Sequence, residues 1–172
     1  VVARYPTAKP YSDYREMLQQ DDIDAVIIAT PPHWHCLQAV DACKAGKDIY
    51  LQKPMTRHLA ESFAVKHAVR KHAIICQVGT QIHSSENYRR VVELVRSGNL
   101  GKVSVARAFS VMNQGTEGIG NPPNGAPPEG LDWENWLGPH PERAFNPLIV
   151  KNAYENCSFM DSSGGWTPGM AP

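Results

Sequence analysis

The fold is decided by the stretch Asp24-Ala-Val-Ile-Ile-Ala-Thr30-Pro31-Pro32. Its apolar residues are consecutive and three of them are β-branched, so the stretch predicts a strand over residues 24–30. The two prolines cannot continue a ladder of backbone hydrogen bonds, and they mark the end of the strand. An apolar run without polar alternation is typical of a strand buried on both faces, as in a parallel sheet.

Helical and strand patterns alternate along the chain on both sides of this stretch. Short strands are predicted over residues 47–52, 73–79 and 102–112. Helices are predicted from Asp13, over 35–45, over 59–69 and from Tyr88 to Gly98. Strands and helices that take turns in this way are typical of right-handed crossover units around a parallel sheet. The predicted fold class is therefore α/β, a partial Rossmann sheet covered by helices on both sides.

A change of composition after Met112 predicts a second region. Residues 113–130 hold five glycines and four prolines, which is typical of loops. We predict a partial dinucleotide-binding domain over residues 1–101. Residues 102–172 are then expected to be the start of a mixed α/β substrate domain.

Composition and charge exclude several functions. The 172 residues carry 17 basic and 17 acidic side chains, so no positive excess favours nucleic acid or a membrane surface as a partner. The longest apolar run is far shorter than the roughly 20 residues of a membrane-spanning helix. The four cysteines (36, 43, 76 and 157) form no Cys-x-x-Cys pair. They predict free thiols in a reducing, cytoplasmic setting.

Polar side chains follow the first three of the predicted strands. Residues 30–35 follow the first strand, residues 52–56 the second, and residues 77–83 the third. The carboxyl ends of parallel strands meet at one edge of a sheet, where ligands bind. Each segment also has a plain structural interpretation, because threonines cap helices and prolines end strands. Lys53 is the most informative of these residues. A lysine between a strand end and a proline is expected to point into a cleft, where it can act as a hydrogen-bond donor or proton relay. The alternative is a solvated surface lysine.

The His-Trp-His sequence at residues 33–35 offers an alternative chemistry. Two histidines spaced in this way at a strand end can ligate zinc, which would suit a metal-dependent hydrolase using His33 and His35. However, no acidic or cysteine ligand follows the other strands, and the remaining histidines lack a metal-ligand spacing. We therefore predict no metal site.

Three of these segments together resemble a known family. Residues 25–35 (AVIIATPPHWH), 52–56 (QKPMT) and 77–81 (QVGTQ) are similar to the motifs of the Gfo/Idh/MocA oxidoreductases. Residues 11–18, 95–103 and 131–139 resemble the same family. The resemblance implies an NAD(P)-dependent oxidoreductase that acts on a hydroxyl-bearing carbon of a sugar or polyol such as a cyclitol. The family also implies a homo-oligomer.

The resemblance assigns roles to particular residues. The family's Glu-Lys-Pro signature corresponds to Gln52-Lys53-Pro54, with Lys53 reaching the substrate hydroxyl as the catalytic residue and with a Lys-Pro bond that is often cis. Gln52 replaces the usual acid, but its amide keeps an acceptor and adds donors. The remaining cofactor-binding residues implied are Thr30, Pro31, Pro32 and His35.

The sequence departs from the family at both ends. It lacks the Gly-x-Gly-x-x-Gly turn that seats the pyrophosphate of NAD or NADP. Pro168 and Pro172 stand where the family has an Asp and a His that relay a proton. We therefore expect this chain to be a fragment that does not bind NAD(P) tightly by itself. Alternatives are an NAD-dependent glycosidase of the same family and an inactive, non-catalytic fragment.

Overall fold

The computed structural model describes residues 4–107, 109 and 116–165. The chain forms two compact units, Val1–Gly79 and Thr80–Pro172, which we describe separately. The predicted domain boundary between residues 101 and 102 stays a prediction.

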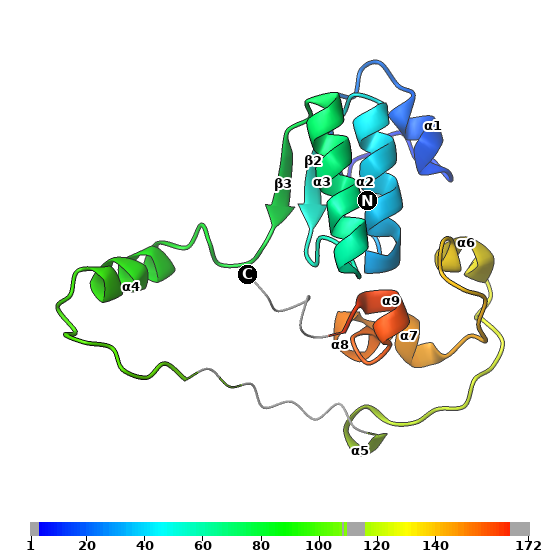
Figure 1. Ribbon diagram of the computed structural model, residues 1–172. Helices are drawn as coiled ribbons and strands as arrows, with labels where there is room; N and C mark the ends of the chain where they lie inside the picture. The colour runs from blue at the N-terminus through cyan, green and yellow to red at the C-terminus, as the bar shows by residue number, and fades with distance from the viewer. Residues whose placement is uncertain (1–3, 108, 110–115, 166–172) are drawn as a thin grey trace. The chain divides into compact units, whose positions relative to one another are not determined.

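The first unit is a parallel sheet with its connecting helices (Figure 1). Its elements are α1 (Tyr14–Leu18), β1 (Ala25–Ile28), α2 (Pro32–Lys44), β2 (Asp48–Gln52), α3 (Leu59–His72) and β3 (Cys76–Gly79). The strands lie in the order β1-β2-β3, and both neighbouring pairs are parallel. The predicted α/β class, Rossmann-like, is confirmed for this unit.

Local sequence explains where the helices begin and end. The Asp13 carboxylate accepts a hydrogen bond from the backbone N–H of Arg15 (2.8 Å) and caps α1. Helix α2 begins at Pro32 rather than at the predicted His35. Proline suits this first helical position, because its fixed φ is helical and the missing N–H would have no helical partner there. Helix α3 ends where Ala73 turns into the left-handed region (φ 55°).

The hydrophobic core lies between the sheet and two helices. Figure 1 shows α2 and α3 side by side over the same face of the sheet. Their inward-facing residues meet the alternate strand residues that point the same way. The fully buried members include Leu51 on the central strand, Cys43 on α2 and Val65 on α3. Burial of this apolar surface is the main source of stability of the unit.

The opposite face of the sheet differs from the prediction. Ile27 and Tyr50 are neighbours in register on this face, and they are 76% and 47% exposed. The expectation of helices on both faces is therefore wrong for the described residues of this unit. Both crossover helices lie on one side, and side chains alternate along a strand, so every second residue of β1 remains exposed.

The second unit contains only helices as regular elements among its described residues. They are α4 (Glu86–Arg96), α5 (Thr116–Ile119), α6 (Trp133–Leu137), α7 (Pro147–Lys151), α8 (Ala153–Asn156) and α9 (Met160–Ser163). One isolated antiparallel bridge joins Gly125 to Phe145.

The predicted strand over residues 102–112 does not form where the structure describes it. Residues 102–107 and 109 have no regular structure, and Val103 and Val105 are exposed. Residues 108 and 110–112 lie outside the described residues. Strand propensity alone does not make a strand, because a strand needs a neighbour for its backbone hydrogen bonds.

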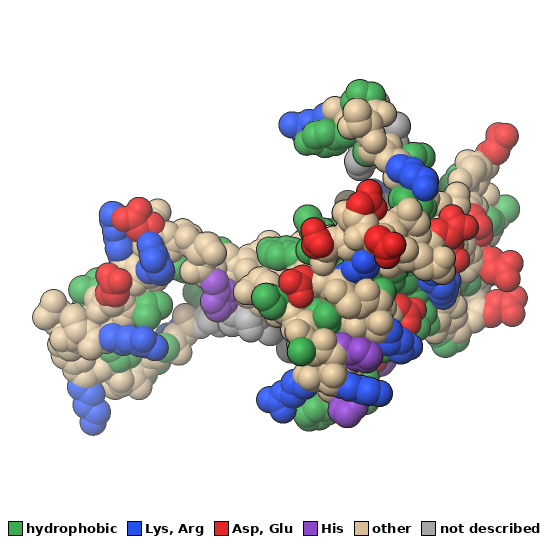
Figure 2. All heavy atoms as spheres, turned by 90° about the horizontal axis from the view of Figure 1, so that it is seen from above, with side chains coloured by type: hydrophobic (Ala, Val, Ile, Leu, Met, Phe, Trp, Pro, Cys, Tyr) green, Lys and Arg blue, Asp and Glu red, His purple; other side chains and the backbone are tan. Residues whose placement is uncertain are grey.

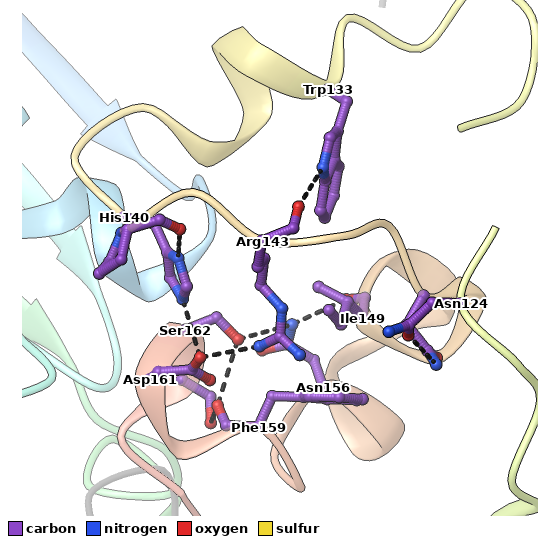
Figure 3. Close-up of polar contacts among 12 residues, drawn as sticks. Asn124, Trp133, His140, Arg143, Ile149, Asn156, Phe159, Asp161 and Ser162 are labelled. Atoms are coloured by element: carbon purple, nitrogen blue, oxygen red, sulfur yellow. Dashed lines mark hydrogen bonds and ion pairs between the residues drawn. The ribbon is translucent and has the colours of Figure 1, made fainter. Parts of the chain in front are cut away.

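A small cluster between α6 and α9 holds part of the second unit together (Figure 3). The Trp133 ring stacks on Trp136, with a centroid distance of 4.9 Å, and meets Phe145 edge-on at 5.2 Å. The indole N–H of Trp133 donates to the backbone oxygen of Arg143 (3.0 Å). The Arg143 guanidinium in turn pairs with Asp161 (2.8 Å). Aromatic packing and these polar contacts therefore fix the loop between α6 and α7.

Helix α4 is amphipathic, as its spacing predicts. Its apolar residues Tyr88, Val91, Val92 and Val95 remain about half exposed. In Figure 2 apolar side chains lie between basic and acidic ones in this region. A groove of about 430 Å³ runs along the helix and is lined by Ile82, His83, Tyr88, Arg89, Val92, Glu93 and Arg96. None of the residues predicted to be catalytic or cofactor-binding lines this groove. Within the described part of the chain, no helix is both long and apolar enough to span a bilayer.

Candidate functional site

The candidate site lies at the carboxyl edge of the three-stranded sheet. Ile28, Leu51 and Val78 are partners across the three strands, so the strands end at nearly the same level. The segments after β1 and β2 are therefore neighbours, as the sequence predicts. They carry Thr30-Pro31-Pro32 and Lys53-Pro54.

His35 joins the two segments. Its ring nitrogens Nδ1 and Nε2 lie 2.7 Å from the backbone oxygen of Pro54 and 2.8 Å from that of Thr30. The side chain extends from the first turn of α2 and is only 1% exposed. Both ring nitrogens thus contact the protein backbone.

A second contact holds Thr30 from the same helix. The Thr30 hydroxyl donates a hydrogen bond to Oε1 of Gln38 (2.7 Å), and Gln38 is buried. Gln38 lies three residues after His35, so both side chains leave α2 on one face. Helix α2 therefore contacts both the carbonyl oxygen and the hydroxyl of Thr30, in the segment that follows β1.

Lys53 is half-buried in the turn that follows β2. The Lys53–Pro54 peptide bond is cis, as the family resemblance implies. The backbone N–H of Lys53 donates to Oε1 of Gln52 (2.9 Å), so the amide at position 52 supplies the acceptor that a carboxylate would supply. The Gln52 side chain is otherwise exposed at the edge of the sheet.

Gly79 makes room for two side chains of β2. A methyl group at this position would lie 2.8 Å from the ring of Tyr50 and 3.0 Å from Oε1 of Gln52. These separations are shorter than any normal van der Waals contact between such atoms. Glycine at the end of β3 therefore lets the side chains of Tyr50 and Gln52 lie across it, and a larger residue would displace them.

An ion pair lies directly after the Lys53–Pro54 turn, at the start of α3. Arg57 and Glu61 are joined at 2.8 Å, and Glu61 also accepts from the backbone N–H of Arg57 (3.0 Å). Burial alone would raise the pKa of Glu61, but the Arg57 guanidinium and nearby backbone N–H groups outweigh it and lower that pKa. Thr56 adds a hydrogen bond to the backbone oxygen of His58 (3.1 Å).

Burial also governs the ionisation of His35. Desolvation lowers the pKa of the ring, and the carbonyl oxygens of Pro54 and Thr30 oppose this effect without cancelling it. The neutral ring has one N–H and can donate to only one of the two oxygens.

The arrangement offers no support for the metal alternative. His33 and His35 both lie in the first turns of α2 and are both buried, rather than side by side on an extended segment. The described residues contain no group of three His, Cys, Asp or Glu side chains placed to hold a metal ion. None of the four cysteines forms a disulfide bond. Burial raises the pKa of the Cys36, Cys43 and Cys76 thiols.

Sequence reasoning missed three contributors to this edge of the sheet. Gln38 could have been found as a polar residue on the apolar face of α2, next to Ala39 and Ala42. Gly79 lies in the quoted QVGTQ segment (77–81), which assigns it no role of its own, and the pairing of Arg57 with Glu61 carries no distinctive signal. The predicted departures at Pro168 and Pro172 lie outside the described residues.

A parallel sheet with polar groups at its carboxyl edge is typical of α/β proteins that bind a ligand at the ends of their strands. Residues 1–80 match the model of an oxidoreductase family with an NAD-binding Rossmann fold, Gfo/Idh/MocA. Residues 1–80 are therefore similar to the NAD-binding Rossmann domain of the Gfo/Idh/MocA oxidoreductases.

Individual relatives agree with this placement. The chain is 35% identical over 98 residues to scyllo-inositol 2-dehydrogenase (NAD(+)) of Bacillus subtilis, covering 57% of this chain and 29% of the relative. It is 30% identical over 90 residues to an alpha-N-acetylgalactosaminidase of Shewanella oneidensis, covering 52% and 20%.

A solved structure shows the same likeness. Scyllo-inositol dehydrogenase from Lactobacillus casei with bound NAD(H) and scyllo-inositol matches with a TM-score of 0.50 and 30% identity, covering 54% of this chain and 28% of that one. The chain thus spans less than a third of the length of each of these three relatives.

Proposed function

We propose that the whole protein to which this chain belongs transfers hydride between NAD(P) and a hydroxyl-bearing carbon of a sugar or cyclitol. The observation that carries the proposal is the joining of the Thr30 turn and the Lys53–Pro54 turn at the carboxyl edge of the sheet. The B. subtilis and L. casei relatives, which are inositol dehydrogenases by name, support this substrate class.

The residues present fit the nicotinamide part of the cofactor. The amide of Gln52 is exposed at the carboxyl edge of the sheet and offers both hydrogen-bond donors and an acceptor, while Tyr50 and Gln52 cover Gly79 at the end of β3. Thr30, Pro31 and Pro32 form the turn on the first strand. The 172 residues contain no Gly-x-Gly-x-x-Gly turn of the kind that binds a pyrophosphate.

In this proposal the protein positions its ligands, while the bound cofactor supplies the hydride acceptor or donor. Lys53 donates a hydrogen bond from Nζ to the substrate hydroxyl and assists its deprotonation. Gln52 holds the backbone of Lys53, and Thr30, Pro31, Pro32 and Pro54 border the nicotinamide. His35 is buried, so in this proposal it acts by holding the backbone of Thr30 and Pro54 rather than by contacting the cofactor.

The proposal is tested in the whole protein with Lys53→Ala and the matched control Lys66→Ala, whose exposed lysine lies on α3. Formation of reduced nicotinamide is followed with a panel of sugars and cyclitols. We expect Lys53→Ala to lower kcat/KM by about 10²-fold or more, as for other lost proton-transfer groups, and Lys66→Ala to leave it unchanged. Turnover by Lys53→Ala within about threefold of the unsubstituted protein would contradict the assignment.

The Shewanella relative favours a second candidate, an NAD-dependent glycosidase. The two candidates differ in their products, since a glycosidase releases the aglycone and leaves no net reduced cofactor. An aryl N-acetylgalactosaminide serves as the probe. Release of the aryl alcohol without accumulation of NADH or NADPH would favour the glycosidase, and net reduction with free cyclitols would favour the dehydrogenase.

From the family resemblance we also propose that the whole protein is a homo-oligomer. Free cysteines support a reducing, cytoplasmic compartment. Light scattering of the purified whole protein measures the oligomeric state directly, and a monomeric mass would contradict the first of these proposals.

A further inference from the structure

We propose that His35 is a positioning residue whose contact with Pro54 sets the place of Lys53 relative to the Thr30 turn. The inference rests on the proposed function only in taking Lys53 as the catalytic side chain. The contact itself is open to a separate test.

The geometry singles out this residue among the groups around the site. The ring of His35 touches backbone oxygens of two segments that are 24 residues apart in the sequence, Thr30 and Pro54, at 2.8 and 2.7 Å. Pro54 directly follows Lys53, so the contact acts one residue from the lysine. Gln38, another polar residue of α2, is hydrogen-bonded to Thr30.

The surroundings make the contact rigid. His35 is 1% exposed and extends from a helix whose next turns, at Ala39, Ala42 and Cys43, are fully buried against the sheet. Interior side chains packed in this way occupy one position, and a hydrogen bond shielded from water is not exchanged for one to solvent. The carbonyl oxygen of Pro54 is therefore held in place by a side chain that is itself part of the buried interior of the unit.

A pair of substitutions separates the two contacts of the ring. The amide nitrogen of asparagine stands at the same number of bonds from Cβ as Nδ1 of histidine, and that of glutamine at the same number as Nε2. His35→Asn therefore keeps a donor for Pro54, whereas His35→Gln keeps a donor for Thr30. If the Pro54 contact positions Lys53, only His35→Asn preserves that position.

The position of Lys53 is read by NMR in the 172-residue chain. Its lysines are dimethylated with ¹³C-formaldehyde, and the Lys53 signal is assigned with Lys53→Arg. We expect this signal to stay at its original shift in His35→Asn and to move or broaden in His35→Gln. Val65→Ala is the stability control, because it removes core contacts at a residue of α3 that contributes no hydrogen bond to the turn after β2. It should lower the thermal midpoint and leave the signal in place.

Several results would overturn the inference. These are a Lys53 signal unchanged in His35→Gln, a signal displaced equally in both His35 variants, and a signal displaced to the same extent in Val65→Ala. A measurement without substitution covers the case of variants that do not fold. The unsubstituted chain must show a His35 Nδ1–H proton protected from solvent exchange, and its absence refutes the hydrogen bond to Pro54. Failure of the proposed function would appear instead as a whole protein without nicotinamide-dependent activity, whatever the Lys53 signal shows.

Discussion

Thr30→Val tests the contact that fixes the end of β1. Valine has nearly the shape of threonine, so the substitution removes the hydroxyl that donates to Gln38 and changes little else. Oε1 of Gln38 then stays buried without its donor. A buried acceptor that loses its partner costs about 1–3 kcal/mol of unfolding free energy. Because Thr30 is half-buried and water can partly replace it, we expect the lower part of this range, about 1–2 kcal/mol.

The double variant Thr30→Val/Gln38→Leu gives the sharper expectation. Replacing both partners by apolar groups leaves no stranded acceptor, and such replacements are often nearly neutral. We therefore expect the double variant to be more stable than Thr30→Val alone, with a coupling free energy of about 1 kcal/mol between the two sites. That corresponds to a difference of roughly 0.5–1 M in the urea midpoint.

Urea unfolding is followed by ¹⁹F NMR of 5-fluorotryptophan at Trp34, which lies in α2 and reports on the first unit alone. Far-UV circular dichroism of the same samples follows the whole chain. Strictly additive costs in the double variant would refute the reasoning, because they would show that the hydroxyl and the amide do not depend on each other. A Thr30→Val variant as stable as the original chain would refute it too.

Three further predictions concern the stability of the first unit. Leu51→Ala, at a fully buried position of the central strand, should cost about 2–5 kcal/mol in urea unfolding, and a loss below about 1 kcal/mol would contradict the described core. The lowered pKa of His35 means that the unfolded chain takes up a proton more readily than the folded chain. The unfolding free energy should therefore be constant above the ordinary histidine pKa of 6.5 and decline as the pH falls below it. His35→Gln should flatten this part of the profile. The lowered pKa of Glu61 contributes stability above 4.5 that is lost as the pH falls through the folded value; Arg57→Ala should remove most of that pH dependence, as measured by thermal unfolding between pH 3 and about 6.

The sequence was a good guide to the strands and a weaker guide to their surroundings. The apolar run before Pro31 predicts β1, because its β-branched residues favour a strand and the two prolines end it. The same run gives no information on which side its crossover helices lie, so the exposure of Ile27 could not be foreseen. Val103 and Val105 show the converse, because their β-propensity forms no strand without a neighbouring one.

The candidate site was predictable only where topology decides it. Parallel strands necessarily bring Thr30 and Lys53 to one edge, and this follows from the order of the elements. The contact between His35 and Pro54 depends on the path of the turn and the depth of α2, and these are tertiary properties that local patterns do not carry. The family resemblance assigns His35 to the cofactor site. It could not indicate that both ring nitrogens contact backbone oxygens.

The shared level at which the three strands end has a consequence for variation in length. Connections at the opposite, amino-terminal edge, such as Gly46-Lys47 and Ala73–Ile75, can gain or lose residues without altering the spacing of the groups at the carboxyl edge. One extra residue between Gln52 and Pro54 would instead move Pro54 away from His35 by most of a residue's length. Natural homologues and engineered variants should therefore tolerate insertions on one side of this sheet and reject them on the other.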